Sequence, residues 1–296
     1  MFRKMMYLTS LMTVVMMLSA CGANIRINPF TAEETVTQSF TPSAAPRIVV
    51  EMFNGSVDVV TGSDNTVKVD VVKRGGGMSQ AAAEDDLKNV EVTITQDGDT
   101  IRVVAKRTDQ RVDLGNTGAS AKLRVPNGAI LDLRSSNGSI TTSGPVSDVT
   151  AQTSNGPINT RGSLGQLDLN TSNGPITING GSGLIDVETS NGPIEITADN
   201  AVVVGRTSNG PFRFTGTLAQ GRNEMRTSNG SIVVTLPATA QFVVDANTSN
   251  AKISSDFSVT AQDFSDDRLR GTVGSDPGTT LELQTSNGPI EIRQGR

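Results

Sequence analysis

Apolar and polar residues alternate along most of the chain beyond residue 45, in short runs that recur at a nearly fixed interval. Residues 167–171 (LDLNT) form one such run, and residues 176–178 (ITI) form a second one a few positions later. Alternation puts every second side chain on the same face of a strand, so each run predicts a strand with one buried and one solvent-facing side. Each unit of the chain is therefore expected to contain two strands joined by a turn.

The turn between the two strands carries a Thr-Ser-Asn-Gly motif or a close variant of it. Its asparagines are Asn137, Asn155, Asn173, Asn191, Asn209, Asn229, Asn250 and Asn287. Successive members are 18, 18, 18, 18, 20, 21 and 37 residues apart, and a degenerate copy surrounds Asn54. A sustained period near 20 residues is typical of solenoid folds, and the long last interval indicates an insertion over residues 256–276. We attribute the turn to Asn and Gly because both residues tolerate a positive φ.

Two arrangements of these strands are compatible with the motif. Asn-Gly between apolar runs is also the strongest hairpin signal, which predicts an antiparallel sandwich or propeller. Stacked coils about 4.8 Å apart explain, in addition, why the units keep one length and one residue type at each position. We therefore predict an all-β fold, a parallel β-solenoid with coils of about 18 residues. Its inward columns are expected to be Leu131, Val149, Leu167, Ile185, Val203, Val244 and Leu281, and Ile140, Ile158, Ile176, Ile194, Phe212, Ile232 and Ile290.

The region before the repeats is suited to covering the exposed end of such a stack, which is otherwise an open sheet edge. Residues 45–125 are predicted to be a β-rich cap, with strands over 47–60, 66–72, 90–95 and 100–105. They also contain one short helix, over residues 79–87, which begins at an N-cap Ser79 and contains no helix breaker. Residues 126–296 are assigned to the solenoid.

The N-terminus has the features of an export signal. Residues 1–20 combine Arg3 and Lys4 with an apolar run of residues 5–18, which is too short to favour a spanning helix. The run ends in residues 18–22 (LSACG), which resemble the bacterial lipobox. The resemblance implies cleavage before Cys21, a diacylglycerol on its sulfur and, through Gly22, sorting to the outer membrane in a Gram-negative host. Residues 21–44 are polar, lack sustained periodicity and are predicted to be a lipid-anchored flexible tether.

Composition narrows the chemistry that the protein can perform. The chain has no His and one Cys, so it lacks the commonest general base and metal ligand and has no intrachain disulfide. A net charge of −5 without a dense Lys/Arg stripe argues against nucleic acid as a partner. No cofactor or resident metal is expected.

Two columns of the repeat are candidate sites. The eight asparagines are expected to be structural, each bonding to its neighbours along the stack and to turn backbone groups. Asp168 and Asp186 lie five residues before their asparagines, so they are expected one coil apart and are the best candidates for a cation or ligand. A solvated acidic face is the simpler interpretation, with compensation between coils such as Glu188 with Arg206.

The Thr-Ser-Asn-Gly units, the lipobox, residues 123–129 (LRVPNGA) and the closing residues 281–292 (LELQTSNGPIEI) together resemble a known bacterial family. It is the β-strand-repeat domain family of unknown function labelled "putative adhesin", and the resemblance covers residues 45–296. It implies a right-handed, parallel β-solenoid at the cell envelope and brings no catalytic residues.

The leading hypothesis is a non-enzymatic envelope lipoprotein that binds an envelope protein or a surface glycan while its lipid holds it to the membrane. The alternatives are an accessory protein in envelope-stress sensing and a β-helix enzyme acting on polysaccharide.

Overall fold

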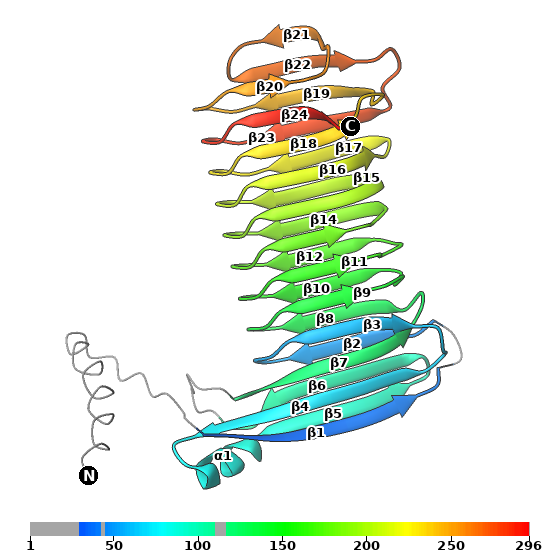
Figure 1. The fold of residues 1–296 in the computed structure, drawn as a ribbon, viewed down its shortest axis with the longest axis vertical. Helices are drawn as coiled ribbons and strands as arrows, with labels where there is room; N and C mark the ends of the chain where they lie inside the picture. The colour runs from blue at the N-terminus through cyan, green and yellow to red at the C-terminus, as the bar shows by residue number, and fades with distance from the viewer. Residues whose placement is uncertain (1–29, 43–44, 110–116, 296) are drawn as a thin grey trace, which may run out of the picture.

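Stacked coils of β-strand form a rod in the computed structural model, which describes residues 30–42, 45–109 and 117–295 (Figure 1). Each regular coil contributes one strand to each of two long faces, with the Asn-containing turn between them. The strands of successive coils pair in parallel, for example Val149 with Leu167 and Ile158 with Ile176. The predicted parallel β-solenoid is confirmed.

The first face, called face 1, carries the strand that follows each Asn turn. In spatial order its strands are β1 (Phe30–Phe40), β4 (Val67–Gly77), β7 (Gly118–Pro126), β3 (Val57–Gly62), β9 (Ile140–Ser143), β11 (Ile158–Arg161), β13 (Ile176–Asn179), the first half of β15 (Ile194–Thr207), β16 (Phe212–Leu218), β18 (Ile232–Pro237), β24 (Ile290–Gly295) and β20 (Ile253–Ser255). At about 4.8 Å between neighbours, this row of strands makes a rod roughly 50 Å long.

The second face, called face 2, carries the strand that precedes each Asn turn. In spatial order its strands are β5 (Val90–Asp97), β6 (Thr100–Arg107), β2 (Arg47–Met52), β8 (Ile130–Ser135), β10 (Val149–Thr153), β12 (Leu167–Thr171), β14 (Gly183–Thr189), the second half of β15, β17 (Gly221–Arg226), β23 (Thr279–Gln284), β19 (Phe242–Asn247), β22 (Arg268–Val273) and β21 (Thr260–Phe264). β15 belongs to both faces because it bends around the corner between them, where Asn200 has a φ of 53°.

The space between the two faces is filled by the apolar side chains of the alternating runs. All fourteen residues predicted for the inward columns are buried, among them Leu167, Ile176 and Phe212. The alternation is visible within single strands, since β12 buries Leu167, Leu169 and Thr171 and turns Asp168 and Asn170 outward. Hydrophobic burial of stacked Val, Ile and Leu therefore holds the rod together with few aromatic side chains.

The order of coils along the rod differs from their order along the chain at both ends. The coil of β2 and β3 lies between β6–β7 and β8–β9, although it precedes all four strands in sequence. Likewise the last coil, β23 and β24, lies between β17–β18 and the earlier coil β19–β20, as the red strands within the yellow and orange ones show (Figure 1). The middle of the rod, from β8 to β18, stacks in chain order.

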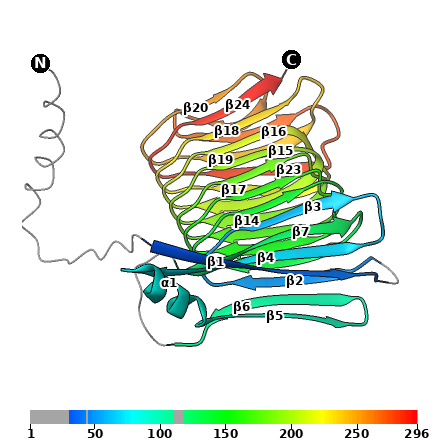
Figure 2. The ribbon, with the colours of Figure 1, turned by 60° about the horizontal axis from the view of Figure 1, so that its bottom comes forward.

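Antiparallel strands close both ends of the rod. At the base, β4 pairs antiparallel with β7, β1 with β4, and β5 with β6. Helix α1 (Gln80–Leu87) packs on β4 and β1, and Ser79 caps its first turn by accepting a hydrogen bond from the Ala82 N–H (Figure 2). At the other end, the insertion predicted over residues 256–276 supplies β21 and β22, which pair antiparallel with each other, while β22 also pairs antiparallel with β19.

Two sequence predictions at the base need correction. The strand predicted over residues 47–60 is two strands, because Asn54-Gly55 turns the chain as the later repeats do, and this coil belongs to the stack. The tether predicted over residues 21–44 is wrong for residues 30–40, which form β1. The sequence of β1 has only a weak alternation of apolar residues, so the strand was not recognised. Several of its polar side chains form ion pairs with β4, such as Glu33 with Arg74 and Glu34 with Lys73. The predicted signal peptide and Cys21 lie outside the described residues.

Candidate functional site

The threonine of each Asn turn points into the rod and ties two coils together. Its hydroxyl donates a hydrogen bond to the carbonyl of the glycine one coil below, and it accepts one from the N–H of its own glycine in most turns. In the coil of Thr189 these bonds reach the Gly174 carbonyl at 3.1 Å and the Gly192 N–H at 3.2 Å. The same donated bond is made by Thr153, Thr171, Thr207, Thr227, Thr285 and Thr248, and by Ser135 in its place.

The glycine of the turn is required by close packing, and not by a positive φ as the sequence suggested. None of the turn glycines is among the described residues with positive φ, and neither are the ladder asparagines. A Cβ on Gly192 would instead lie 1.8 Å from the Gly174 carbonyl oxygen, and the distance is 1.8 Å for Gly174 over Gly156 as well. Stacked turns therefore touch through their backbones, and any larger residue would push two coils apart.

The asparagines form one continuous ladder along the rod. From Asn137 onward, each Nδ2 donates to the Oδ1 of the preceding asparagine in the row, over distances of 2.6 to 2.8 Å. The ladder runs Asn54, Asn137, Asn155, Asn173, Asn191, Asn209, Asn229, Asn287, Asn250. Asn287 thus lies between Asn229 and Asn250, as the coil order requires, and Asn54 begins the row. The side-chain amides hydrogen-bond to one another along the rod, so their role is structural.

The serine of each turn is left free by this scheme. Its side chain points outward on face 2, and the row along the rod is Ser136, Ser154, Ser172, Ser190, Ser208, Ser228, Ser286 and Ser249. Within the described part of the chain, none of these hydroxyls makes a hydrogen bond to another protein group. The row is a strip of available donors and acceptors at the repeat spacing of about 4.8 Å.

Asp168 and Asp186 are neighbours on the outward side of face 2, in register on β12 and β14. Burial raises the pKa of the Asp186 carboxyl, and the negative charge of Asp168 raises it further while Arg206 lowers it. The described residues place no third His, Cys, Asp or Glu with them in a group suited to a metal ion. The pair is thus a site of mutual repulsion, and the geometry adds no further cation ligand to it.

The repeat becomes irregular in the coils from β15 to β17. Phe212 takes the position that isoleucine holds in the coils below, and its ring occupies the space above Gly205, where a Cβ would lie 2.2 Å from the ring. Asn223 lies fully buried in the inward column between Val203 and Leu281. Its Oδ1 accepts the Val203 N–H at 2.9 Å, so the side chain replaces a backbone partner where the coil widens.

A buried carboxylate gathers three arginines on the outward side of the same coils. The side chain of Glu224 is 9% exposed and lies 2.9 Å from Arg206, 2.9 Å from Arg226 and 3.2 Å from Arg222. Arg222 also binds Glu282 at 2.7 Å. Arg206 is therefore paired with Glu224 rather than with Glu188, which corrects the sequence prediction. We call Arg206, Arg222, Glu224 and Arg226 the arginine cluster.

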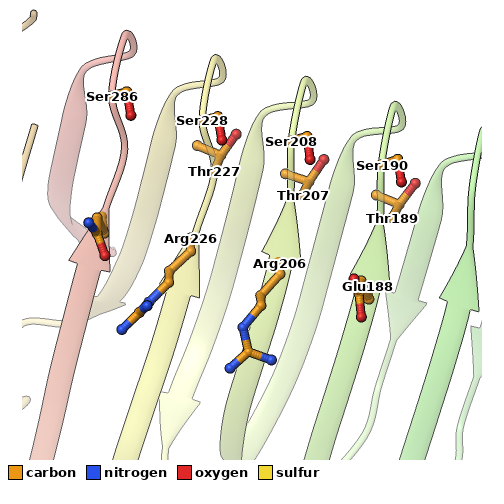
Figure 3. Close-up of a pocket in the computed structure, with 11 residues that line it drawn as sticks. Glu188, Thr189, Ser190, Arg206, Thr207, Ser208, Arg226, Thr227, Ser228 and Ser286 are labelled. Atoms are coloured by element: carbon orange, nitrogen blue, oxygen red, sulfur yellow. The ribbon is translucent and has the colours of Figure 1, made fainter. Parts of the chain in front are cut away.

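Two hollows lie on face 2 between the serine row and the outward side chains of the strands. The upper hollow, of about 340 Å³, is lined by Glu188, Arg206 and Arg226 on one side and by Ser190, Ser208, Ser228 and Ser286 on the other (Figure 3). Figure 3 shows the hydroxyls near the turns and the two guanidinium groups directed away from them. The lower hollow, of about 480 Å³, is lined by Glu51, Phe53, Lys106, Arg134, Ser136 and Ser154, among others.

Only some features of this site are visible in the sequence. The serines are part of the motif, but a fixed place in a motif does not tell whether a side chain is consumed or free. Glu224 and its arginines are recognisable as outward charges, whereas their convergence depends on the register of β15, β17 and β23. As a site, the two hollows offer hydroxyls, amides and guanidinium groups for binding, with no aligned nucleophile and base among the residues that line them.

Most of the chain matches a known protein family. The sequence model of the Toastrack DUF4097 family matches residues 47–293. A solved structure described as a "putative adhesin" from Bacteroides fragilis NCTC 9343 is similar over 88% of this chain and 97% of its own, with 8% identity and a TM-score of 0.46. One from Parabacteroides distasonis ATCC 8503, described in the same words, is similar over 90% and 98%, with 10% identity and a TM-score of 0.34. No curated protein matches the chain by sequence.

Proposed function

The chain belongs to the Toastrack DUF4097 family, and from that premise we propose that it is a non-enzymatic, lipid-anchored protein of the bacterial cell envelope. In this proposal the rod has an adhesin-like role and binds another component of the cell surface through its long face 2. The lipid on Cys21 holds it to a membrane, which is the outer membrane in a Gram-negative host.

One observation carries the binding role. The side chains that recur in every coil are engaged by neighbouring coils, through the asparagine ladder and the threonine bonds. The serine row remains free. The charged residues that differ from coil to coil lie beside this row, in the two hollows. A rigid, repetitive frame with specific residues on one outer face suits recognition of an extended ligand.

The absence of catalysis is proposed on the chemistry of the chain. With no His in the sequence, a catalytic pair would have to come from carboxylates, Lys, Tyr or hydroxyl groups. The buried acid of the arginine cluster, Glu224, is engaged in ion pairs with Arg206 and Arg226 at 2.9 Å and has no hydroxyl or second carboxylate among these partners. The described residues contain no helix long and apolar enough to cross a membrane.

The proposed anchor fixes which end of the rod is near the membrane. The start of β1 at Phe30 is nine residues after Cys21, and such a segment spans at most roughly 30 Å when extended. β1 is the outermost strand at the base, so the base would stay near the bilayer. The hairpin of β21 and β22, with its exposed Phe264, would then point away from it.

Binding is tested by titrating isolated cell envelopes with the purified chain. Saturable binding is expected, without release of soluble sugar fragments from the envelope polysaccharide. Fragment release in proportion to the amount of protein would overturn the non-enzymatic assignment. Binding that never saturates, or none at all, would overturn the adhesin-like role.

The anchor is tested separately in the native host. Labelled palmitate is expected to enter the wild-type protein and to be absent from a Cys21→Ser variant, which should also leave the membrane fraction. Equal labelling of both proteins would refute lipidation at Cys21 without bearing on what face 2 binds.

A further inference from the structure

We propose that the two hollows of face 2 bind an acidic polysaccharide that lies along the rod beside the asparagine ladder. The inference rests on the proposed binding function and names its ligand class. It draws on four features of the described residues: local charge, the fixed posture of the arginines, the free hydroxyl row and the spacing of the two hollows.

The lining of each hollow contains more cations than acids, in a chain whose net charge is −5. Among the charged residues lining the upper hollow are two cations, Arg206 and Arg226, and one acid, Glu188. Those of the lower hollow are likewise two cations, Lys106 and Arg134, and one acid, Glu51, which is itself paired with Arg102 at 3.1 Å. Two minus one leaves one positive charge among the side chains that line each hollow. The acids that pair with these cations, Glu224 at the upper hollow and Asp132 and Glu91 at the lower one, lie outside the lining, so the lining itself presents cationic donors to an anionic ligand.

The arginines of the upper hollow are held ready for a ligand. Arg206 and Arg226 are direct neighbours on β15 and β17, and both bind the same oxygen of the buried Glu224, each at 2.9 Å. Their side chains are nevertheless 48% and 43% exposed, so donors remain for an incoming group. A guanidinium group has five N–H donors, and a fixed one loses little freedom when it binds a carboxylate.

A polysaccharide fits this surface better than a peptide does. Extended peptides commonly bind by adding a strand to a sheet edge, but β14, β15, β17 and β23 are each paired on both sides. The upper hollow also lacks an apolar pocket for an anchoring side chain, since its lining is Ser, Thr, Gln and charged residues. Four free serine hydroxyls in a line instead match the hydroxyl groups of a sugar chain.

The distance between the two hollows makes binding depend on the length of the ligand. Arg134 and Arg206 are separated by four coil steps, through Gln152, Asn170 and Glu188, which amounts to roughly 20 Å. A chain shorter than this fills one hollow, whereas a longer one engages both and gains from the high effective concentration of its second half. Affinity should therefore rise steeply once the ligand spans that distance.

The test uses the full chain and polygalacturonate fragments of graded length, with dextran as the neutral polymer and poly-L-glutamate as the acidic peptide. Polygalacturonate is expected to bind, more weakly at high salt, with a step in affinity near the spanning length. Dextran and poly-L-glutamate should bind at least tenfold more weakly. Poly-L-glutamate binding as tightly as polygalacturonate would overturn the proposal, and so would no binding of polygalacturonate.

Two variants locate the site. Arg206→Gln with Glu224→Gln and Arg226→Gln removes the cations without leaving Glu224 unpaired, and should weaken binding at least tenfold. Ser208→Asp leaves the arginine cluster intact, places a negative charge in the upper hollow and should weaken binding similarly. The matched controls are Arg213→Gln on face 1 and Ser172→Asp, which has the same place in its turn but lies outside the lining of both hollows.

The outcomes separate this inference from the function on which it rests. If the chain binds isolated envelopes saturably and both upper-hollow variants bind polygalacturonate like the wild type, the ligand assignment fails and the adhesin-like role stands. If envelope binding itself is absent, the proposed function fails, whatever polygalacturonate does in solution.

Discussion

The coils from β8 to β14 and the coils from β15 to β17 share the same Asn turn but differ in the residues that their strands carry. In the first group each position of the repeat holds the residue type that stacking favours, and Ile, Val and Leu fill the inward columns. In the second group the column contains Asn223, the Ile position holds Phe212, and the outward acid becomes a buried Glu224 with three arginines. The residue types of the regular coils are explained by stacking alone. The residues that depart from them in the irregular coils are not required by stacking, and they are therefore candidates for a binding role.

The irregular residues compensate one another locally. The missing side chain of Gly205 leaves room for the Phe212 ring, which is larger than the isoleucine of the other coils. Asn223 supplies the acceptor that the Val203 N–H would otherwise lack. Such paired changes preserve the ladder and the threonine bonds across these coils, as those of Thr207 and Thr227 show. The frame therefore tolerates a specialised segment without losing its register.

The largest expected effect concerns the frame itself. Gly192→Ala should lower the free energy of unfolding by about 3 kcal/mol, because its Cβ would lie 1.8 Å from the Gly174 carbonyl oxygen. Gly181→Ala is the control, since its nearest contact is 3.6 Å away, and it should change stability by less than about 1 kcal/mol. Urea unfolding measures both, and equal effects would show that turn contact is not the constraint.

The second effect tests whether an irregular coil can be made regular. Gly205→Val alone should destabilise by about 2–3 kcal/mol, because the Phe212 ring fills its space. Phe212→Ile alone should cost about 1–2 kcal/mol through the cavity that it leaves. Together they recreate the Val187 and Ile194 pair of the coil below, so the double variant should be more stable than the sum of the two costs implies, by about 1 kcal/mol. Strict additivity in a double-mutant cycle would contradict the compensation.

The third effect is specific to one backbone amide. Asn223→Leu restores an apolar column but removes the acceptor of the Val203 N–H, and should cost about 2 kcal/mol. Hydrogen exchange at Val203 should accelerate more than at amides elsewhere in β15. Asn247→Leu, an exposed asparagine on the same face, is the control and should leave the Val203 amide unchanged. An unaltered exchange rate in Asn223→Leu would show that this bond does not protect the amide.

The smallest effect depends on pH and lies at the border of the two groups. The pKa of Asp186 is raised by burial and by Asp168, so the folded chain holds its proton to a higher pH than the unfolded chain does. Stability contributed by this group is therefore present at low pH and is lost as the pH rises through the folded-state pKa. Asp186→Asn should raise Tm slightly at pH 7 and not below the pKa of the unfolded carboxyl. Thr150→Asn, at the same position two coils away, should show no such pH dependence.

Local pattern was enough to predict which side chains face inward, because alternation within a strand depends on that strand alone. It did not predict which coils are neighbours: Asn250 and Asn287 carry the same motif, and only the fold reveals that Asn287 contacts Asn229. The Asn-Gly turn was predicted with the wrong cause, since the packing of one turn on another is invisible in a single copy. β1 was missed because its partners are charges on a distant strand.

The candidate site was predictable in its parts and not in its assembly. Outward acids were expected to be solvated, and Asp168 is exposed as expected, whereas Glu224 at the equivalent position is buried under three arginines. Their approach depends on the register of β15 and β17, which places Arg206 beside Arg226 and Val204 beside Glu224. The length of a repeat is a clue to such a site, because the 18-residue interval ends where the specialised coils begin.

The position of the last coil has a consequence for how the polypeptide matures. Synthesis proceeds from the N-terminus, yet β19 and β20 dock on β23 and β24, which are later strands of the chain. During synthesis, β19 and β20 therefore emerge before the strands on which they dock, and they stay unpaired with that coil until β23 and β24 have been made. A premature stop codon in this stretch would leave two unsatisfied strand edges instead of a shorter rod, and exposed edges are sites of aggregation. The coil of β23 and β24 thus supplies strand partners to both of its neighbouring coils.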